Sequence, residues 1–149
     1  MVDLPEYISA NEVQRVCAEL GIRDWTQLDE AVVMIEEAEA IREELGGETL
    51  EIPVEEFRHG LEVELEHGLR FADANVTNNH PLLTGKIVLA HLKEMLDYYV
   101  RLRVAELEGD MFKAFVAGDA GELATRYSGV IEAREELAQS EARGRAPKI

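Results

Sequence analysis

Two pairs of side chains with the chemistry of metal ligands or acid–base groups occur in mirrored order along the sequence. Glu64 and His67 are three residues apart, and so are His91 and Glu94. Residues at positions i and i+3 of a helix project from one face, about one turn apart. Carboxylate oxygens and imidazole nitrogens are ligands of zinc, iron and manganese. If the two segments are antiparallel helices, the spacing predicts one divalent transition-metal site (Zn, Fe or Mn) with these four residues as ligands.

The same residues have two other interpretations. Glu–His pairs between helices also form metal-free hydrogen-bond networks that set how the helices register, and two carboxylates act as acid and base without a metal. Asp and Glu make up 31 of 149 residues, so an acid three residues from a His is expected by chance. Glu56 and His59 repeat the spacing on a polar face. No catalytic residue and no enzyme class is therefore assigned.

Helical segments of the required kind contain both pairs. Pro53 predicts the start of a helix that runs to about residue 71, and Pro81 the start of one that continues to about residue 107. On a helical wheel, Glu64 falls inside the apolar arc of the first helix and His91 inside that of the second. His67 and Glu94 border these arcs. We expect a buried or half-buried cluster inside a central antiparallel hairpin, over about residues 53–107.

Glycines in the first of these helices, Gly60 and Gly68, each weaken it by roughly 1 kcal/mol. This cost predicts the close approach of a neighbouring helix. The loop that follows, residues 72–80, is rich in Asp and Asn. It resembles the start of a calcium loop, but Asn78 replaces the turn glycine, so Asx turns are the preferred interpretation.

The rest of the chain has helical spacing and no strand alternation of useful length. The further predicted helices span about residues 10–20, 26–45, 110–116 and 122–141. The sequence therefore predicts an all-α bundle of five to six helices in a single domain, residues 1–141, with a flexible tail over 142–149.

Composition restricts the partners. A formal charge of −16 argues against a nucleic-acid partner, because no basic face is available to release counterions from phosphates. No apolar run approaches the roughly 20 residues that span a bilayer, and no signal peptide is recognisable, so a cytoplasmic protein without a membrane partner is expected. Cys17, the one cysteine, is predicted to lie in the core. The alternative to a metal protein is an interaction or assembly module that binds another protein or a second copy of itself.

Several short motifs resemble a family of small bacterial, archaeal and viral proteins, a domain of unknown function. They are EFxxGLxVELEHG at residues 56–68, NVTN at 75–78, TGKIxLAHLxE at 84–94 and DYY at 97–99. The resemblance covers about residues 12–107; residues 32–50 look like an insertion and the region after Met111 like an extension. It implies no activity. It implies only that Glu64, His67, His91 and Glu94 belong to the family's characteristic motifs.

Overall fold

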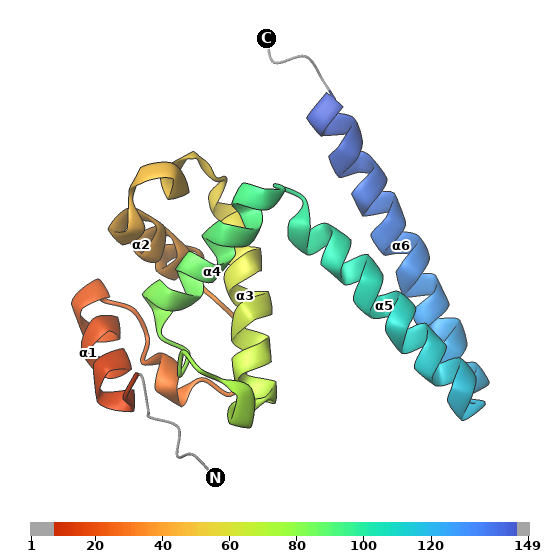
Figure 1. Ribbon diagram of the computed structural model, residues 1–149, viewed down its shortest axis with the longest axis horizontal. Helices are drawn as coiled ribbons and strands as arrows, with labels where there is room; N and C mark the ends of the chain where they lie inside the picture. The colour runs from red at the N-terminus through yellow and green to blue at the C-terminus, as the bar shows by residue number, and fades with distance from the viewer. Residues whose placement is uncertain (1–7, 146–149) are drawn as a thin grey trace. The chain divides into compact units, whose positions relative to one another are not determined.

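The computed structural model describes residues 8–145, and within this range every regular element is helical (Figure 1). The α-helices are α1 (Ala10–Leu20), α2 (Ile35–Leu45), α3 (Val54–Arg70), α4 (Pro81–Glu94), α5 (Tyr98–Ala117) and α6 (Ala120–Arg145). Short 3-10 turns occur at Trp25–Gln27, Gly47–Glu51 and Ala72–Ala74. The prediction of an all-α bundle of five to six helices is confirmed. In the described range, every helix is too short or too polar to cross a bilayer.

Contacts divide the chain into two compact units, Met1–Lys93 and Glu94–Ile149. The first unit contains α1 to α4, and the second contains α5 and α6. The single domain predicted over residues 1–141 stays a prediction. Each unit is described by itself.

The core of the first unit is formed by side chains from α1 to α4 and from the connection after α1. Its most buried members are Val13, Cys17, Trp25, Val33, Ile41, Phe57, Leu61, Leu65 and Val88. Helix α1 begins where the Ser9 hydroxyl accepts a hydrogen bond from the Glu12 backbone N–H. It ends at Gly21, whose φ of +68° is left-handed. The start and end of α1 and the burial of Cys17 agree with the predictions.

Helix α2 is shorter than predicted. A helix was expected from Thr26, but this residue lies in a 3-10 turn in which the Asp24 carboxylate accepts the Thr26 N–H at 2.9 Å. The chain then runs without regular structure to Met34. Helix α2 begins at the next residue, where the Glu37 carboxylate accepts the Met34 N–H at 2.9 Å. The group that caps the start of α2 is therefore the Glu37 carboxylate, which lies within the first turn of the helix. Sequence spacing alone does not distinguish it from the neighbouring glutamates.

The helix predicted over residues 81–107 is two helices. Helix α4 ends at Glu94, and a turn over residues 95–97 separates it from α5. In this turn the Tyr98 N–H donates to the Met95 carbonyl oxygen, and the Asp97 carboxylate pairs with Arg101 at 2.7 Å. The first contact closes the turn, and the second lies within the first turn of α5. Neither glycine nor proline marks the break, so the pattern gave no signal of it.

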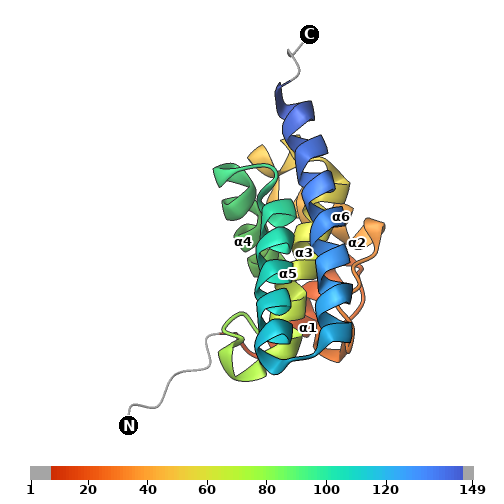
Figure 2. The ribbon, with the colours of Figure 1, turned by 90° about the vertical axis from the view of Figure 1, so that its right-hand side faces the viewer.

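Helices α5 and α6 pack against each other as an antiparallel pair, side by side in both views (Figures 1 and 2). The chain was expected to break at Gly109, but α5 continues through it to Ala117. Helix α6 begins after the Asp119 carboxylate accepts the Glu122 N–H at 2.9 Å. The predicted tail started at residue 142, whereas α6 extends to Arg145; residues 146–149 lie outside the described range.

Candidate functional site

Glu64 on α3 and His91 on α4 are brought together, as the mirrored spacing predicts. Glu64 Oε1 lies 3.6 Å from His91 Nε2, and the two side chains are 16% and 32% exposed. Helix α3 descends and α4 rises at an incline to it in Figure 1, so their directions are roughly opposed. The pair therefore forms a half-buried polar contact between the two helices.

The other two predicted ligands are more exposed than their wheel positions indicated. His67 is exposed in the last turns of α3, where its ring lies 6.5 Å from that of Phe71. Glu94 is also exposed, at the end of α4, and belongs to the second unit. The helical-wheel prediction assumed that two long helices pack against each other along their whole length. Helix α4 instead ends at Glu94, so no further turn of that helix covers this carboxylate.

The donor atoms do not gather in the way that a metal ion requires. Among residues 8–145, no group of three or more His, Cys, Asp or Glu side chains is arranged to hold an ion. A protein transition-metal site commonly has three or four protein ligands. Glu64 and His91 supply two donors. The transition-metal site therefore stays a prediction of the sequence.

Gly68 is required by the loop that follows α3, and not by a neighbouring helix as predicted. A Cβ atom at this position would lie 2.1 Å from Asn79 Oδ1. Asn75 Nδ2 donates to Asn79 Oδ1 at 2.8 Å and also to the Gly68 carbonyl oxygen at 3.2 Å. Asn78 and Asn79 both have positive φ, +51° and +59°. The asparagines thus fold this loop tightly onto the end of α3.

A close approach of helices occurs at Gly85 on α4, whereas the prediction for Gly60, which is buried on α3, stays a prediction. A Cβ atom there would lie 2.8 Å from Leu45 Cδ1, 3.0 Å from Ile41 Cγ2 and 3.2 Å from Phe57 Cζ. These side chains come from α2 and α3. The absence of a side chain at Gly85 therefore lets α4 pack directly on both helices.

A small hollow and a larger groove flank this loop. The hollow, of about 210 Å³, is lined by Glu64, His67, Gly68, Phe71, Ala74, Asn75, Val76, Thr77 and Ile87. The groove, of about 700 Å³, is lined by Ile8, Val76, Thr77, Leu83, Lys86, Ile87 and Ala90. The two share Val76, Thr77 and Ile87, and Val76 is 72% exposed. An open, mainly apolar surface therefore continues from the Glu64 side chain to one face of α4.

His80, which was not among the predicted site residues, is the most buried of the four histidines. It is 6% exposed, and its Nδ1 accepts a 3.4 Å hydrogen bond from the Leu83 N–H at the start of α4. Burial lowers the pKa of His80, and the nearby Glu12 carboxylate opposes this effect. His80 directly precedes Pro81, which opens α4, so its place in the sequence makes it a potential helix cap. This position was the signal from which its role could have been predicted.

A second buried polar group was also missed. Glu37, on the acidic face of α2, is 4% exposed and pairs with Arg23 at 2.7 Å. Burial acts to raise the pKa of Glu37, but the hydrogen bonds from Arg23 and from the Met34 N–H lower it below its ordinary value. This carboxylate ties the start of α2 to the segment after α1. It has a structural role.

The helices and the groove define an all-α protein with an apolar surface beside a Glu–His contact. The family model described as "Protein of unknown function (DUF5661)" matches residues 13–108. The match covers more than half of the chain, so the chain belongs to this family, as its motifs indicated. No curated protein and no solved structure matches the chain.

Proposed function

We propose that the protein is a metal-free protein-interaction module. Its binding surface is the groove between α4 and the loop that precedes it, and its occupant is an apolar segment of a partner protein. The observation that carries this proposal is the run of apolar side chains along the groove, with Val76 at its edge 72% exposed. Exposed apolar patches of this kind are typical of interaction sites.

The chemistry of the groove favours a peptide segment with an apolar face. Leu83, Ile87 and Ala90 lie on α4 at spacings of four and three, so they form one apolar stripe. A partner helix with apolar residues at corresponding spacing would fit against such a stripe. The first unit carries 20 of the 31 acidic residues and 7 of the 15 basic ones. Basic residues flanking the apolar segment would therefore speed association.

In this account the Glu64–His91 contact is structural. It joins α3 to α4 beside the groove and holds the α4 stripe in place. At 3.6 Å this is a polar contact longer than a hydrogen bond, and a half-exposed pair of this kind contributes about 0–1 kcal/mol to folding. The same contact is also the observation that favours a second candidate function, a transition-metal site. His67 and Glu94 would complete this site, and their exposed side chains would have to turn inward to do so.

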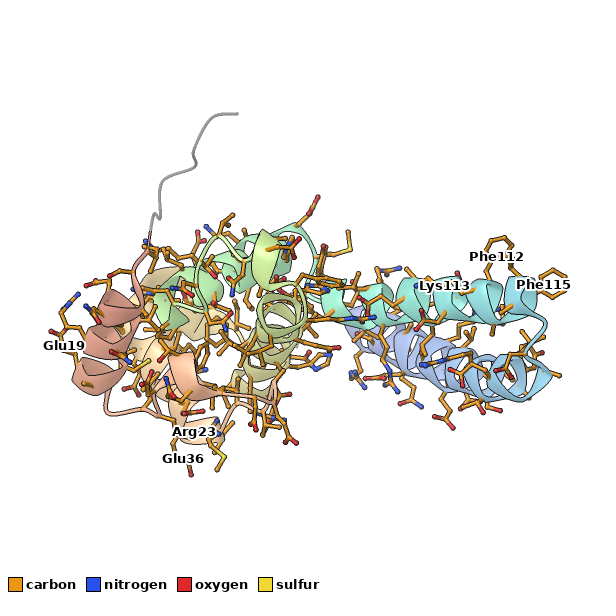
Figure 3. All side chains as sticks on the ribbon, turned by 90° about the horizontal axis from the view of Figure 1, so that it is seen from below. Glu19, Arg23, Glu36, Phe112, Lys113 and Phe115 are labelled. Carbon is orange, nitrogen blue, oxygen red and sulfur yellow. The ribbon has the colours of Figure 1, made fainter. Side chains whose placement is uncertain are left out.

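The experiment that tests the groove is site-specific photo-crosslinking in cells. A photoreactive amino acid at position 76 is compared with the same group at Glu19, whose side chain is 64% exposed on α1 (Figure 3). We expect one discrete protein adduct from position 76, none from position 19, and loss of the adduct in the Ile87→Asp variant. Equal adducts at both positions, no adduct at position 76, or an adduct that survives Ile87→Asp would contradict the proposal.

A further inference from the structure

Helices α5 and α6 each carry two apolar stripes, and only one of them is used between the two helices. The inner stripe includes Val130 and Ala133, which are buried. At Gly129, an added Cβ would meet Leu107 Cδ2 at 3.4 Å, so this glycine lies directly under a side chain of α5. The inner stripes thus form the seam of the hairpin.

The outer stripes follow the same alternating spacing of three and four residues, which is typical of helices that pack in bundles. On α5 the outer stripe consists of Leu102, Ala105, Gly109, Phe112 and Val116, and on α6 of Ala120, Ala124, Tyr127 and Ile131. A repeat of this kind on both sides of a helix predicts neighbours on both sides. The hairpin itself supplies only one.

The outer stripes end in a cluster of large apolar side chains, which we name the hairpin face. It consists of Phe112, Phe115, Val116, Tyr127 and Ile131, each between 45% and 69% exposed. Figure 3 shows Phe112 and Phe115 projecting outward from α5. These residues follow the part of the chain that the family model matches, which ends at residue 108.

The ion pairs between the helices show that the hairpin face is continuous. Arg126 Nη1 lies 3.7 Å from Asp110 Oδ2, which puts Tyr127 close to the level of Gly109 and therefore within one helical turn of Phe112 along the hairpin. With the inner stripes facing each other, helical geometry turns Phe115 and Tyr127 toward the same side of the hairpin. Side chains from both helices therefore form one patch.

We propose that the hairpin face is the interface of a homodimer, in which two copies of the chain join their α5–α6 hairpins into a four-helix bundle. Hairpins that present a second apolar stripe commonly complete such bundles. An aromatic side chain has about 150–250 Å² of surface to bury, and the three on this face are 57–66% exposed, so each offers about 130 Å². With Val116 and Ile131, the face offers about 500 Å² per copy, so a two-fold pair buries about 1,000 Å², the size at which specific association begins.

The charge distribution favours a second copy on this surface. Residues 1–93 carry a formal charge of −13, from 20 acidic and 7 basic side chains. Residues 94–149 carry −3, from 11 acidic and 8 basic side chains. Two copies that approach through their first units would repel each other, whereas two hairpins carry almost balanced charge. The inference is independent of the groove proposed above, because it concerns the other unit.

The test is sedimentation velocity of the full chain over a range of concentrations. We expect a dimer, twice the chain mass of 16.7 kDa, with a dissociation constant in the micromolar range. Phe112→Glu and, separately, Tyr127→Glu should each raise this constant at least about tenfold, because each places a charge in the centre of the interface. The second variant tests the face from the other helix.

The matched control is Phe71→Glu, which makes the same change at a phenylalanine that is 47% exposed in the first unit. It should leave the dimer unchanged. Circular dichroism on each variant establishes that the helices are intact. A wild-type chain that stays monomeric, a dimer that survives both hairpin substitutions, or equal weakening by Phe71→Glu would overturn the proposal.

Discussion

Glu37 provides the sharpest test of how the first unit is held together. Its carboxylate accepts hydrogen bonds from Arg23 Nε at 2.8 Å, from Arg23 Nη2 at 2.7 Å and from the Met34 N–H at 2.9 Å. The Arg23 N–H adds a fourth at 3.2 Å. Glu37→Gln keeps the size of the side chain but removes its charge and directs an NH2 group at these donors. The perturbation therefore removes the charge and the hydrogen bonds to one of the two oxygens, with little change in shape.

The expected loss of stability follows from this geometry. Removing one partner of a buried ion pair costs about 3–5 kcal/mol when the other partner stays buried. The Arg23 side chain is 41% exposed, so in the variant water can solvate part of the guanidinium group and reduce this cost. We therefore expect Glu37→Gln to lower the free energy of unfolding by about 2–3 kcal/mol, close to the upper range for a hydrogen bond to a charged group. This corresponds to a decrease of about 6–10 °C in melting temperature for a chain of this length.

The assay is urea unfolding followed by circular dichroism, with Glu36→Gln as the matched control. Glu36 is the adjacent residue on α2 and is exposed at the outer edge of the unit (Figure 3). The control should change the free energy of unfolding by less than about 0.5 kcal/mol. If Glu37→Gln falls within the same limit, or if both variants lose equal stability, the buried ion pair does not stabilise the fold and the reasoning is refuted.

The pH dependence gives an independent readout. The pKa of Glu37 is lower in the folded protein than its ordinary value of 4.5, because the hydrogen bonds from Arg23 and the backbone outweigh the effect of burial. The carboxylate therefore stabilises the fold above pH 4.5, and this contribution is lost as the pH falls through the lower, folded pKa. Stability of the Glu37→Gln variant should lack this acid-dependent component, and an unchanged acid profile would contradict the assignment.

Three further predictions concern single positions. Gly68→Ala should lower stability by about 1–3 kcal/mol in thermal denaturation, because the new methyl group displaces Asn79; an increase would contradict the tight loop. Gly109→Ala, where a Cβ meets nothing within 4 Å, should instead raise it by about 0.5–1 kcal/mol, and a loss would show a crowded position. Because burial lowers the pKa of His80, protonation opposes folding: stability should decline as the pH falls below 6.5. His80→Gln should flatten this decline, and an identical profile in the variant would exclude His80 as its cause.

The elements that could be predicted from the sequence are those whose signals are local. Ser9 and Gly21 bound α1 through their own backbone and side-chain geometry, and Pro53 and Pro81 mark the starts of α3 and α4. The break between α4 and α5 has no such mark. The apolar pattern continues across residues 95–97, where the helix nevertheless gives way to a turn closed by the Tyr98 N–H and the Met95 carbonyl oxygen.

The candidate site could be predicted in part for the same reason. Helical periodicity puts Glu64 and His91 on facing sides, and their 3.6 Å contact follows from two short stretches of helix. The burial of His67 and Glu94 depends on the length over which two helices pack side by side, and helical periodicity contains no information about that length. Likewise, no local signal marks Glu37 as buried, because its partner is an arginine fourteen residues earlier in the sequence.

The central claim is that the protein is an interaction module that needs no metal, and its metal content tests this claim most directly. The untagged protein, purified without chelator or added metal, is measured by elemental mass spectrometry beside the His91→Ala variant. The account predicts that zinc, iron and manganese are all far below one ion per chain in both proteins. Close to one ion per chain in the wild type, lost in His91→Ala, would contradict it and establish a metal site at Glu64 and His91.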